Sequence, residues 1–120
     1  MATVLIVEDE LLLADCYARW LRAEGHTTYH VTDAQQALDM LDEQQVNVVL
    51  LDMLLSGANG MQVLNTLQSH VDLSGLPVVL CSNALPQQLP DFSAYGVKAV
   101  LDKSVLTREK LGIAIAGALA

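Results

Sequence analysis

The feature of this 120-residue chain that most restricts its fold is the alternation of short apolar runs with longer amphipathic stretches. Three of the runs are nearly continuous in Val, Leu and Ile, which is typical of strands buried on both faces of a parallel sheet. The pattern predicts five strands, which are Val4–Val7, Thr28–Val31, Val46–Leu51, Pro77–Cys81 and Lys98–Leu101.

The stretches between the apolar runs predict five helices. One apolar stripe of the first helix holds Leu13, Tyr17, Trp20 and Leu21. Because strand and helix alternate without a linker, repeat or low-complexity segment, we expect one α/β domain over residues 1–120. Its core is a doubly wound parallel sheet of five strands. The helices cover Leu11–Glu24, a segment after the N-cap Asp33, a segment after Gly60, Pro86–Tyr95, and a segment from the N-cap Thr107 to the end.

The charge balance excludes several classes of partner. Six Lys and Arg residues against 14 Asp and Glu residues give a net charge of −8. Such a surface repels phosphate backbones and anionic lipids, so we expect no direct nucleic-acid binding and no membrane association. No apolar run approaches the roughly 18 residues of a membrane span. The start of the chain lacks the basic residues of a signal peptide, and Cys16 and Cys81 form no disulfide framework, so we expect a cytoplasmic protein.

Polar side chains gather where the predicted strands end. Glu8, Asp9 and Glu10 follow the first strand and Asp52 follows the third, while Ser82 and Lys103 follow the fourth and fifth. In doubly wound folds, ligands bind outside the carboxyl ends of the strands. We interpret Glu10, like Asp33, as a cap of the helix that follows it. Asp9 and Asp52, each ending an apolar strand, are the candidates for chemistry.

These residue types indicate phosphoryl transfer assisted by a metal ion. Carboxylates that are gathered together repel one another, and they either raise their pKa values or recruit a cation. Oxygen ligands without a nearby His or Cys favour Mg²⁺, with Mn²⁺ as a second option. A lysine and a hydroxyl facing the metal can hold the oxygens of a transferring phosphoryl group. Asp52 is then the candidate nucleophile.

In this order, Glu8-Asp9, the segment Leu-Leu-Asp52-Met-Leu-Leu-Ser-Gly-Ala-Asn-Gly, Ser82-Asn83-Ala84 and Lys103 resemble the receiver domain of bacterial two-component response regulators. The resemblance covers Val4 to about Leu119 and implies the strand order 2-1-3-4-5. It implies that Asp52 accepts the phosphoryl group, that Ser82 is the switch hydroxyl and that Lys103 binds a phosphoryl oxygen. Mg²⁺ would then be held by Asp9, Asp52 and the backbone carbonyl of Leu54, with Glu8 acting through a water.

The resemblance also implies partners. A sensor histidine kinase or a histidine phosphotransfer protein would supply the phosphoryl group, and a downstream protein or output domain would respond to it. The chain would catalyse only its own phosphorylation and dephosphorylation, and so would not be an enzyme in the usual sense. The resemblance further implies that the residues two after the acceptor and two after the switch hydroxyl influence how quickly the phosphoryl group is lost. Here they are Leu54 and Ala84, which cannot hydrogen-bond an attacking water, so we expect self-dephosphorylation to be slow.

Several residues depart from the family pattern. Ser56 and Asn59 replace a proline and an acid in the loop after the acceptor, and Val100 replaces an aromatic switch residue. Ser104 stands where the family often has a cis proline, so we expect a trans bond there. These departures leave an alternative open, namely a receiver fold that acts as a docking module independently of phosphorylation.

Flavin and nucleotide binding fit this sequence less well than phosphoryl transfer does. The run Glu8-Asp9-Glu10 would repel the phosphate of FMN, and the chain has no glycine-rich nucleotide motif. We expect the three histidines, His26, His30 and His70, to lie outside the acidic edge.

A second apolar stripe on the last helix predicts a contact surface for a partner or a homodimer. It is formed by Ile113, Ala116, Gly117 and Ala120.

Overall fold

The computed structural model describes residues 2–55, 58–69, 75–82 and 96–120. Within these residues five parallel strands form one sheet in the order β2-β1-β3-β6-β7, which confirms the expected doubly wound architecture and the order 2-1-3-4-5. The strands are β1 (Thr3–Val7), β2 (Thr27–Val31), β3 (Val48–Asp52), β6 (Val78–Ser82) and β7 (Val97–Asp102). A short antiparallel ribbon, which the sequence did not predict, follows β3 and consists of β4 (Leu54–Leu55) and β5 (Ala58–Asn59).

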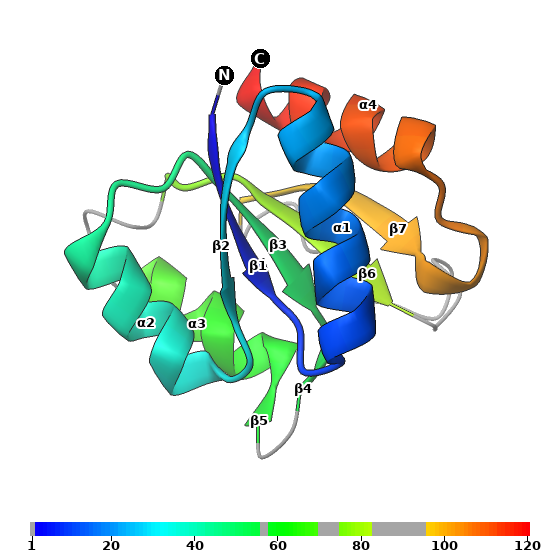
Figure 1. The fold of residues 1–120 in the computed structure, drawn as a ribbon. Helices are drawn as coiled ribbons and strands as arrows, with labels where there is room; N and C mark the ends of the chain where they lie inside the picture. Colours follow the sequence, from blue (N-terminus) through cyan, green and yellow to red (C-terminus); the bar gives the residue numbers. More distant parts are fainter. Residues whose placement is uncertain (1, 56–57, 70–74, 83–95) are drawn as a thin grey trace.

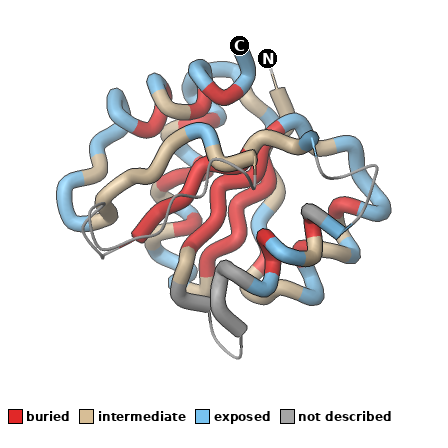
Figure 2. The backbone as a smooth tube through the Cα atoms, turned by 180° about the vertical axis from the view of Figure 1, so that it is seen from behind, coloured by how far each residue is buried: buried red, intermediate tan, exposed pale blue. Residues whose placement is uncertain are grey.

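The three nearly continuous apolar runs form the three interior strands. Every residue of β3 and β6 is buried, as is every residue of β1 after Thr3. The edge strands β2 and β7 are largely half-buried or exposed. Figure 2 shows this contrast as a band of buried backbone through the middle of the sheet. Cover on both faces therefore explains why the interior strands carry apolar side chains at every position except Thr3, Asp52 and Ser82.

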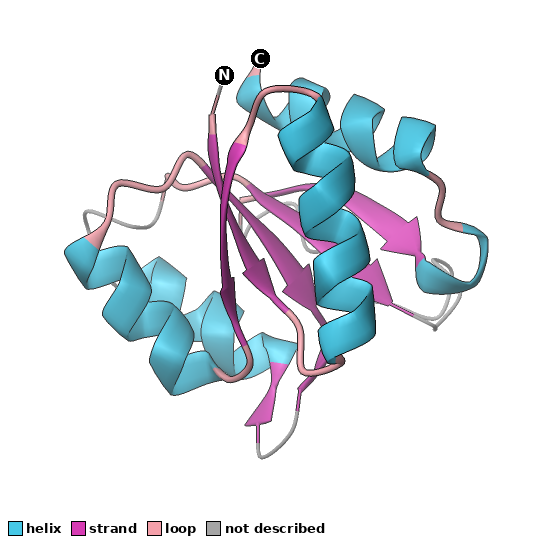
Figure 3. Ribbon diagram, viewed as in Figure 1, coloured by secondary structure: helices cyan, strands magenta, loops and turns pink. Residues whose placement is uncertain are grey.

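Helices cover both faces of the sheet. Helices α1 (Leu11–Ala23) and α4 (Arg108–Leu119) lie on one face, and α2 (Ala34–Glu43) and α3 (Gly60–Ser69) lie on the other (Figure 1 and Figure 3). Each face has its own apolar cluster. Tyr17 and Ile115 belong to the cluster under α1 and α4, and Leu41 and Leu64 belong to the cluster under α2 and α3. The predicted helix Pro86–Tyr95 lies outside the described residues.

Side-chain caps fix two of the helix starts. The carboxylate of Asp33 accepts a hydrogen bond from the backbone N–H of Gln36 at 2.8 Å, and the hydroxyl of Thr107 accepts one from the N–H of Lys110 at 3.2 Å. Both caps were predicted. Glu10 occupies the N-cap position of α1, but its side chain makes no capping hydrogen bond, so the interpretation of Glu10 as a side-chain cap was wrong.

Two strands begin later than the sequence predicts. Strand β3 begins at Val48, directly after Asn47, which bonds to Thr3 twice: its Oδ1 accepts from the N–H of Thr3 at 2.8 Å, and its N–H donates to the carbonyl of Thr3 at 2.9 Å. Strand β6 begins at Val78, since Pro77 has no N–H to donate to the sheet. At their carboxyl ends, β3, β6 and β7 each extend one residue further than predicted, so that Asp52 and Ser82 are the last residues of their strands and Lys103 follows β7 directly.

The apolar stripe of α1 faces the sheet as expected, and α4 also buries apolar side chains against the sheet. Tyr17 and Leu21 are buried and Trp20 is partly buried. On α4, Leu111, Ile115 and Ala118 are buried, whereas Ile113 on the second stripe is 74% exposed. In the part of the chain that the structure describes, no helix has both the length and the apolar character needed to cross a bilayer.

Candidate functional site

Three carboxylates meet at the carboxyl ends of β1 and β3. Each of Glu8, Asp9 and Asp52 offers one oxygen that lies within 4.8 Å of the oxygens of the other two. They come together because β1 and β3 are hydrogen-bonded neighbours, with Val7 opposite Leu51. Glu8 and Asp52 are buried, and Asp9 is half-buried. The acidic cluster predicted from the sequence is therefore present.

Lys103 places an ammonium group against two of these carboxylates. Its Nζ lies 2.9 Å from Oε1 of Glu8 and 3.2 Å from Oδ2 of Asp52, and its side chain is only 10% exposed. Lys103 follows β7, which is separated from β3 by β6, so its long side chain spans the end of β6 to reach the cluster. The sequence predicted that Lys103 faces Asp52, but the contact with Glu8 was not foreseen.

Burial and charge set the proton affinity of these groups. Burial is the main cause that raises the pKa of Glu8 to about 7, and the charge of Asp52 raises it further. The hydrogen bonds from Lys103 and from the N–H of Glu10 lower this pKa, but they do not outweigh burial. Burial opposes the charged form of Lys103. Its contacts with Glu8 and Asp52 outweigh that effect, so the pKa of Lys103 lies above its usual range. An ionised carboxylate cluster is therefore unfavourable without further positive charge.

The donor set fits a hard divalent cation. Three ionised carboxylates and one ammonium leave a charge of −2 at the cluster, which one divalent ion balances. The groups that converge are carboxylate oxygens, and no imidazole or thiolate belongs to the group of candidate ligands found among the described residues. Oxygen donors of this kind suit Mg²⁺ or Mn²⁺. Leu54, whose carbonyl was the fourth expected ligand, lies in β4 two residues after Asp52.

Ser82 ends the strand beside the acceptor strand. Strand β6 pairs with β3 so that Cys81 lies opposite Asp52, and Ser82 is the next residue, 3% exposed. Its hydroxyl thus belongs to the same edge of the sheet as Asp52 and Lys103. Asn83 and Ala84 lie outside the described residues, and so does the loop at Ser56. The side chains of Leu54 and Asn59 are not described either.

The turn after Lys103 is held by side-chain hydrogen bonds. Oδ1 of Asp102 accepts hydrogen bonds from the backbone N–H of Ser104 at 2.9 Å and from its hydroxyl at 2.7 Å. These bonds cap a short 3₁₀ turn over Lys103–Val105. The described residues contain no cis peptide bond, which confirms the trans bond expected at Ser104. In this chain, an Asp–Ser pair shapes the turn that carries Lys103.

Neither His26 nor His30 belongs to the group of candidate metal ligands among the described residues. His30, on the edge strand β2, nevertheless contacts the backbone of the cluster, because its Nε2 lies 2.7 Å from the carbonyl oxygen of Glu8. The sequence could not show this contact, since 22 residues separate the two. His26 does lie away from the cluster, where its Nδ1 accepts a hydrogen bond from the N–H of Ala2. His70 is outside the described residues.

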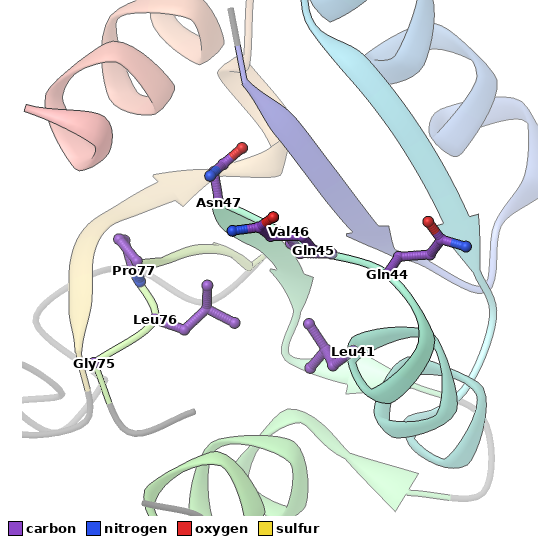
Figure 4. Close-up of a pocket in the computed structure, with 8 residues that line it drawn as sticks. All are labelled: Leu41, Gln44, Gln45, Val46, Asn47, Gly75, Leu76 and Pro77. Atoms are coloured by element: carbon purple, nitrogen blue, oxygen red, sulfur yellow. The ribbon is translucent and has the colours of Figure 1, made fainter. Parts of the chain in front are cut away.

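A pocket lies at the opposite end of the sheet. It has a volume of about 400 Å³ and lies before β3 and β6, at the amino ends of those strands (Figure 4). Carboxamide and apolar side chains line it, and it contains none of the predicted site residues. Its lining residues are Leu41, Gln44, Gln45, Val46, Asn47, Gly75, Leu76 and Pro77.

Comparisons with known proteins agree with this geometry. The family described as the response regulator receiver domain matches residues 4–116. The sensory transduction protein RegX3 of Mycobacterium tuberculosis is 42% identical over 80 residues, which are 67% of this chain and 34% of that protein. The DNA-binding response regulator MtrA of the same species is 38% identical over 77 residues, which are 64% of this chain and 32% of that protein. The chain spans about a third of the length of these relatives.

Solved structures show the same fold. The chemotaxis response regulator CheY4 of Vibrio cholerae superposes with a TM-score of 0.90 at 19% identity, covering 99% of both chains. The Mn²⁺-bound form of the response regulator Rcp1 superposes with a TM-score of 0.78 at 21% identity, covering 97% of this chain and 91% of that chain.

Proposed function

Since this chain belongs to the family of response regulator receiver domains, we propose that it accepts a phosphoryl group on Asp52, with the help of Mg²⁺, in a two-component signalling pathway. The observation that carries the proposal is the position of Lys103. Its ammonium contacts Asp52 at the edge of a three-carboxylate cluster. Anionic ligands for a divalent ion and a cation for phosphoryl oxygens thus both adjoin one nucleophile.

The metal would be held by this chain's own oxygens. Asp9 and Asp52 would bind Mg²⁺ directly, together with the backbone carbonyl of Leu54, and Glu8 would act through a water. When bound, the ion would supply positive charge that balances the carboxylates and the phosphoryl oxygens. Mn²⁺ is a second candidate, which is supported by the Mn²⁺-bound form of the similarly folded Rcp1.

The transfer itself needs little covalent chemistry from the protein. A carboxylate oxygen of Asp52 attacks the phosphorus of a phosphohistidine donor and forms an acyl phosphate. The P–N bond breaks, and its electron pair goes to the imidazole nitrogen. Lys103 holds one phosphoryl oxygen, and the Ser82 hydroxyl donates to another as the switch. Attack by water later releases inorganic phosphate, and we propose no other enzymatic activity.

The partners follow from this chemistry. A sensor histidine kinase or a histidine phosphotransfer protein would be the donor, and the region from Ser82 through β7 to α4 would signal to a downstream protein or output domain. MtrA is by its name a DNA-binding regulator, but it is about three times as long as the matched segment. We propose that this acidic domain itself binds neither DNA nor a membrane and acts in the cytoplasm. Its α4 stripe around Ile113 would contact a partner or a second copy.

Phosphorylation can be tested directly by mass. The protein is incubated with acetyl phosphate and Mg²⁺, and its intact mass is measured. We expect the gain of one phosphoryl group in the wild type and none in Asp52→Asn or in the wild type with excess EDTA. Asp42→Asn, which changes an exposed carboxylate on α2, is the matched control and should be phosphorylated normally. No gain at any Mg²⁺ concentration would overturn the proposal and favour the phosphorylation-independent docking module.

A further inference from the structure

A histidine side chain supports the backbone at the centre of the acidic cluster. Nε2 of His30 lies 2.7 Å from the carbonyl oxygen of Glu8. A carbonyl only accepts hydrogen bonds, so Nε2 carries the hydrogen and donates it. Glu8 is only 2% exposed, whereas His30 is exposed. A solvent-facing ring thus satisfies a backbone group that lies in the buried edge of the site.

The need for this bond follows from where β2 ends. The N–H of Glu8 donates to the carbonyl of Val31 at 3.1 Å, which continues the parallel ladder between β1 and β2. In a parallel ladder, the carbonyl of Glu8 would next accept from the N–H two residues beyond Val31, at Asp33. However, β2 ends at Val31 and Asp33 caps α2. His30 supplies a side-chain donor at the place where the strand no longer supplies a backbone one.

The bond acts on the geometry of the cluster through a rigid peptide. The carbonyl of Glu8 and the N–H of Asp9 belong to one planar unit, so holding the carbonyl sets the direction in which the chain enters Asp9. The carboxylate of Glu8 also accepts a hydrogen bond from the N–H of Glu10 at 3.2 Å. The turn Glu8-Asp9-Glu10 is therefore held by Val31, by His30 and by its own side chain.

We propose that His30 is a positioning residue for the metal site, which orients the Glu8–Asp9 peptide so that both carboxylates face Asp52. This inference rests on the proposed function, because it assumes that the acidic cluster binds a divalent cation. His30 would touch neither the metal nor the phosphoryl group. Its contribution would appear as a change in metal affinity and not as a change in the chemistry at Asp52.

The test compares Mg²⁺ affinity among matched variants of the whole chain by isothermal titration calorimetry. His30→Leu removes the donor. His30→Gln keeps an N–H donor the same number of bonds from the backbone. Thr28→Val changes another residue of β2, and Thr28 and His30 both line a small pocket beside α1. Melting temperatures measured in EDTA report any general loss of stability.

We expect His30→Leu to bind Mg²⁺ about three- to tenfold more weakly than the wild type, the range that one net hydrogen bond supplies. His30→Gln should lie within about twofold of the wild type, and Thr28→Val should match it. With acetyl phosphate, the half-saturating Mg²⁺ concentration should rise in His30→Leu while the plateau rate stays the same.

Each of the remaining outcomes would contradict a specific claim. If His30→Leu binds Mg²⁺ as tightly as the wild type, or if His30→Gln is as weak as His30→Leu, the positioning role is wrong while the proposed function stands. A lower melting temperature with unchanged affinity shows a purely structural role and also overturns the inference. If the wild type itself binds no Mg²⁺, the metal site of the proposed function is wrong, and this inference falls with it.

Discussion

The ammonium of Lys103 lies closer to Glu8 than to Asp52, at 2.9 Å from Oε1 of Glu8 and 3.2 Å from Oδ2 of Asp52. Both carboxylates are buried, so Lys103 compensates charge in the resting protein as well as facing the proposed acceptor. A lysine in this position has two effects that substitutions can separate, one on the stability of the metal-free fold and one on phosphoryl transfer.

Removing the ammonium should destabilise the metal-free protein. We expect Lys103→Met to lower the free energy of unfolding by about 3 kcal/mol at pH 8, because two buried carboxylates lose their counter-charge. Urea denaturation in EDTA measures this change. Lys98→Met is the matched control, since Lys98 is exposed on the same strand, and it should change stability by less than about 0.5 kcal/mol. Equal losses in the two variants would contradict a special role for Lys103.

The raised pKa of Glu8 makes stability depend on pH. Its pKa rises from 4.5 to about 7 on folding, so the native protein binds a proton more tightly than the unfolded chain does. The stabilisation is then complete below about pH 4.5 and is lost as the pH rises through 7. Relative to Glu8→Gln, the metal-free wild type should lose up to about 3 kcal/mol over this range. Denaturation curves at several pH values test this, and parallel profiles would contradict it.

Relief of repulsion should stabilise the metal-free fold. Asp52→Asn removes one of the three clustered charges and leaves Lys103 paired with Glu8, so we expect a gain of about 1 kcal/mol in EDTA. Asp9→Ala should act in the same direction. Asp42→Asn, on the exposed side of α2, should have little effect. If both cluster variants are less stable than the wild type, the carboxylates contribute to the fold through their contacts more than they repel one another.

The two thiols should differ sharply in reactivity. Cys81 is buried in β6, and burial is the main cause that raises the pKa of its thiol to about 12. Cys16 on α1 is half-buried. Because the thiolate is the reactive species, the native protein should gain one label with iodoacetamide at pH 8, as read by intact mass, and two labels in denaturant. Cys16→Ser should remove the fast label. Rapid double labelling of the native protein would contradict this prediction.

Much of the fold could be read from local patterns. The nearly continuous apolar runs became the three interior strands, and the polar residues after them became the edge that carries Glu8, Asp52 and Ser82. This works because burial on both faces requires apolar side chains at successive positions, and a strand's carboxyl end is defined by where its run stops. Side-chain caps at Asp33 and Thr107 are equally local, so they too were predictable.

Contacts between distant segments were decided by the tertiary structure. Lys103 and Glu8 are 95 residues apart in the chain numbering and meet only because of how the strands are ordered and how far the lysine side chain reaches. His30 reaches the carbonyl of Glu8 because β2 ends at Val31, which leaves a backbone acceptor beside an edge strand. The sequence determined which groups stand at the ends of the strands. The packing decided which of them touch, because contact depends on register, strand order and side-chain reach, which local periodicity does not encode.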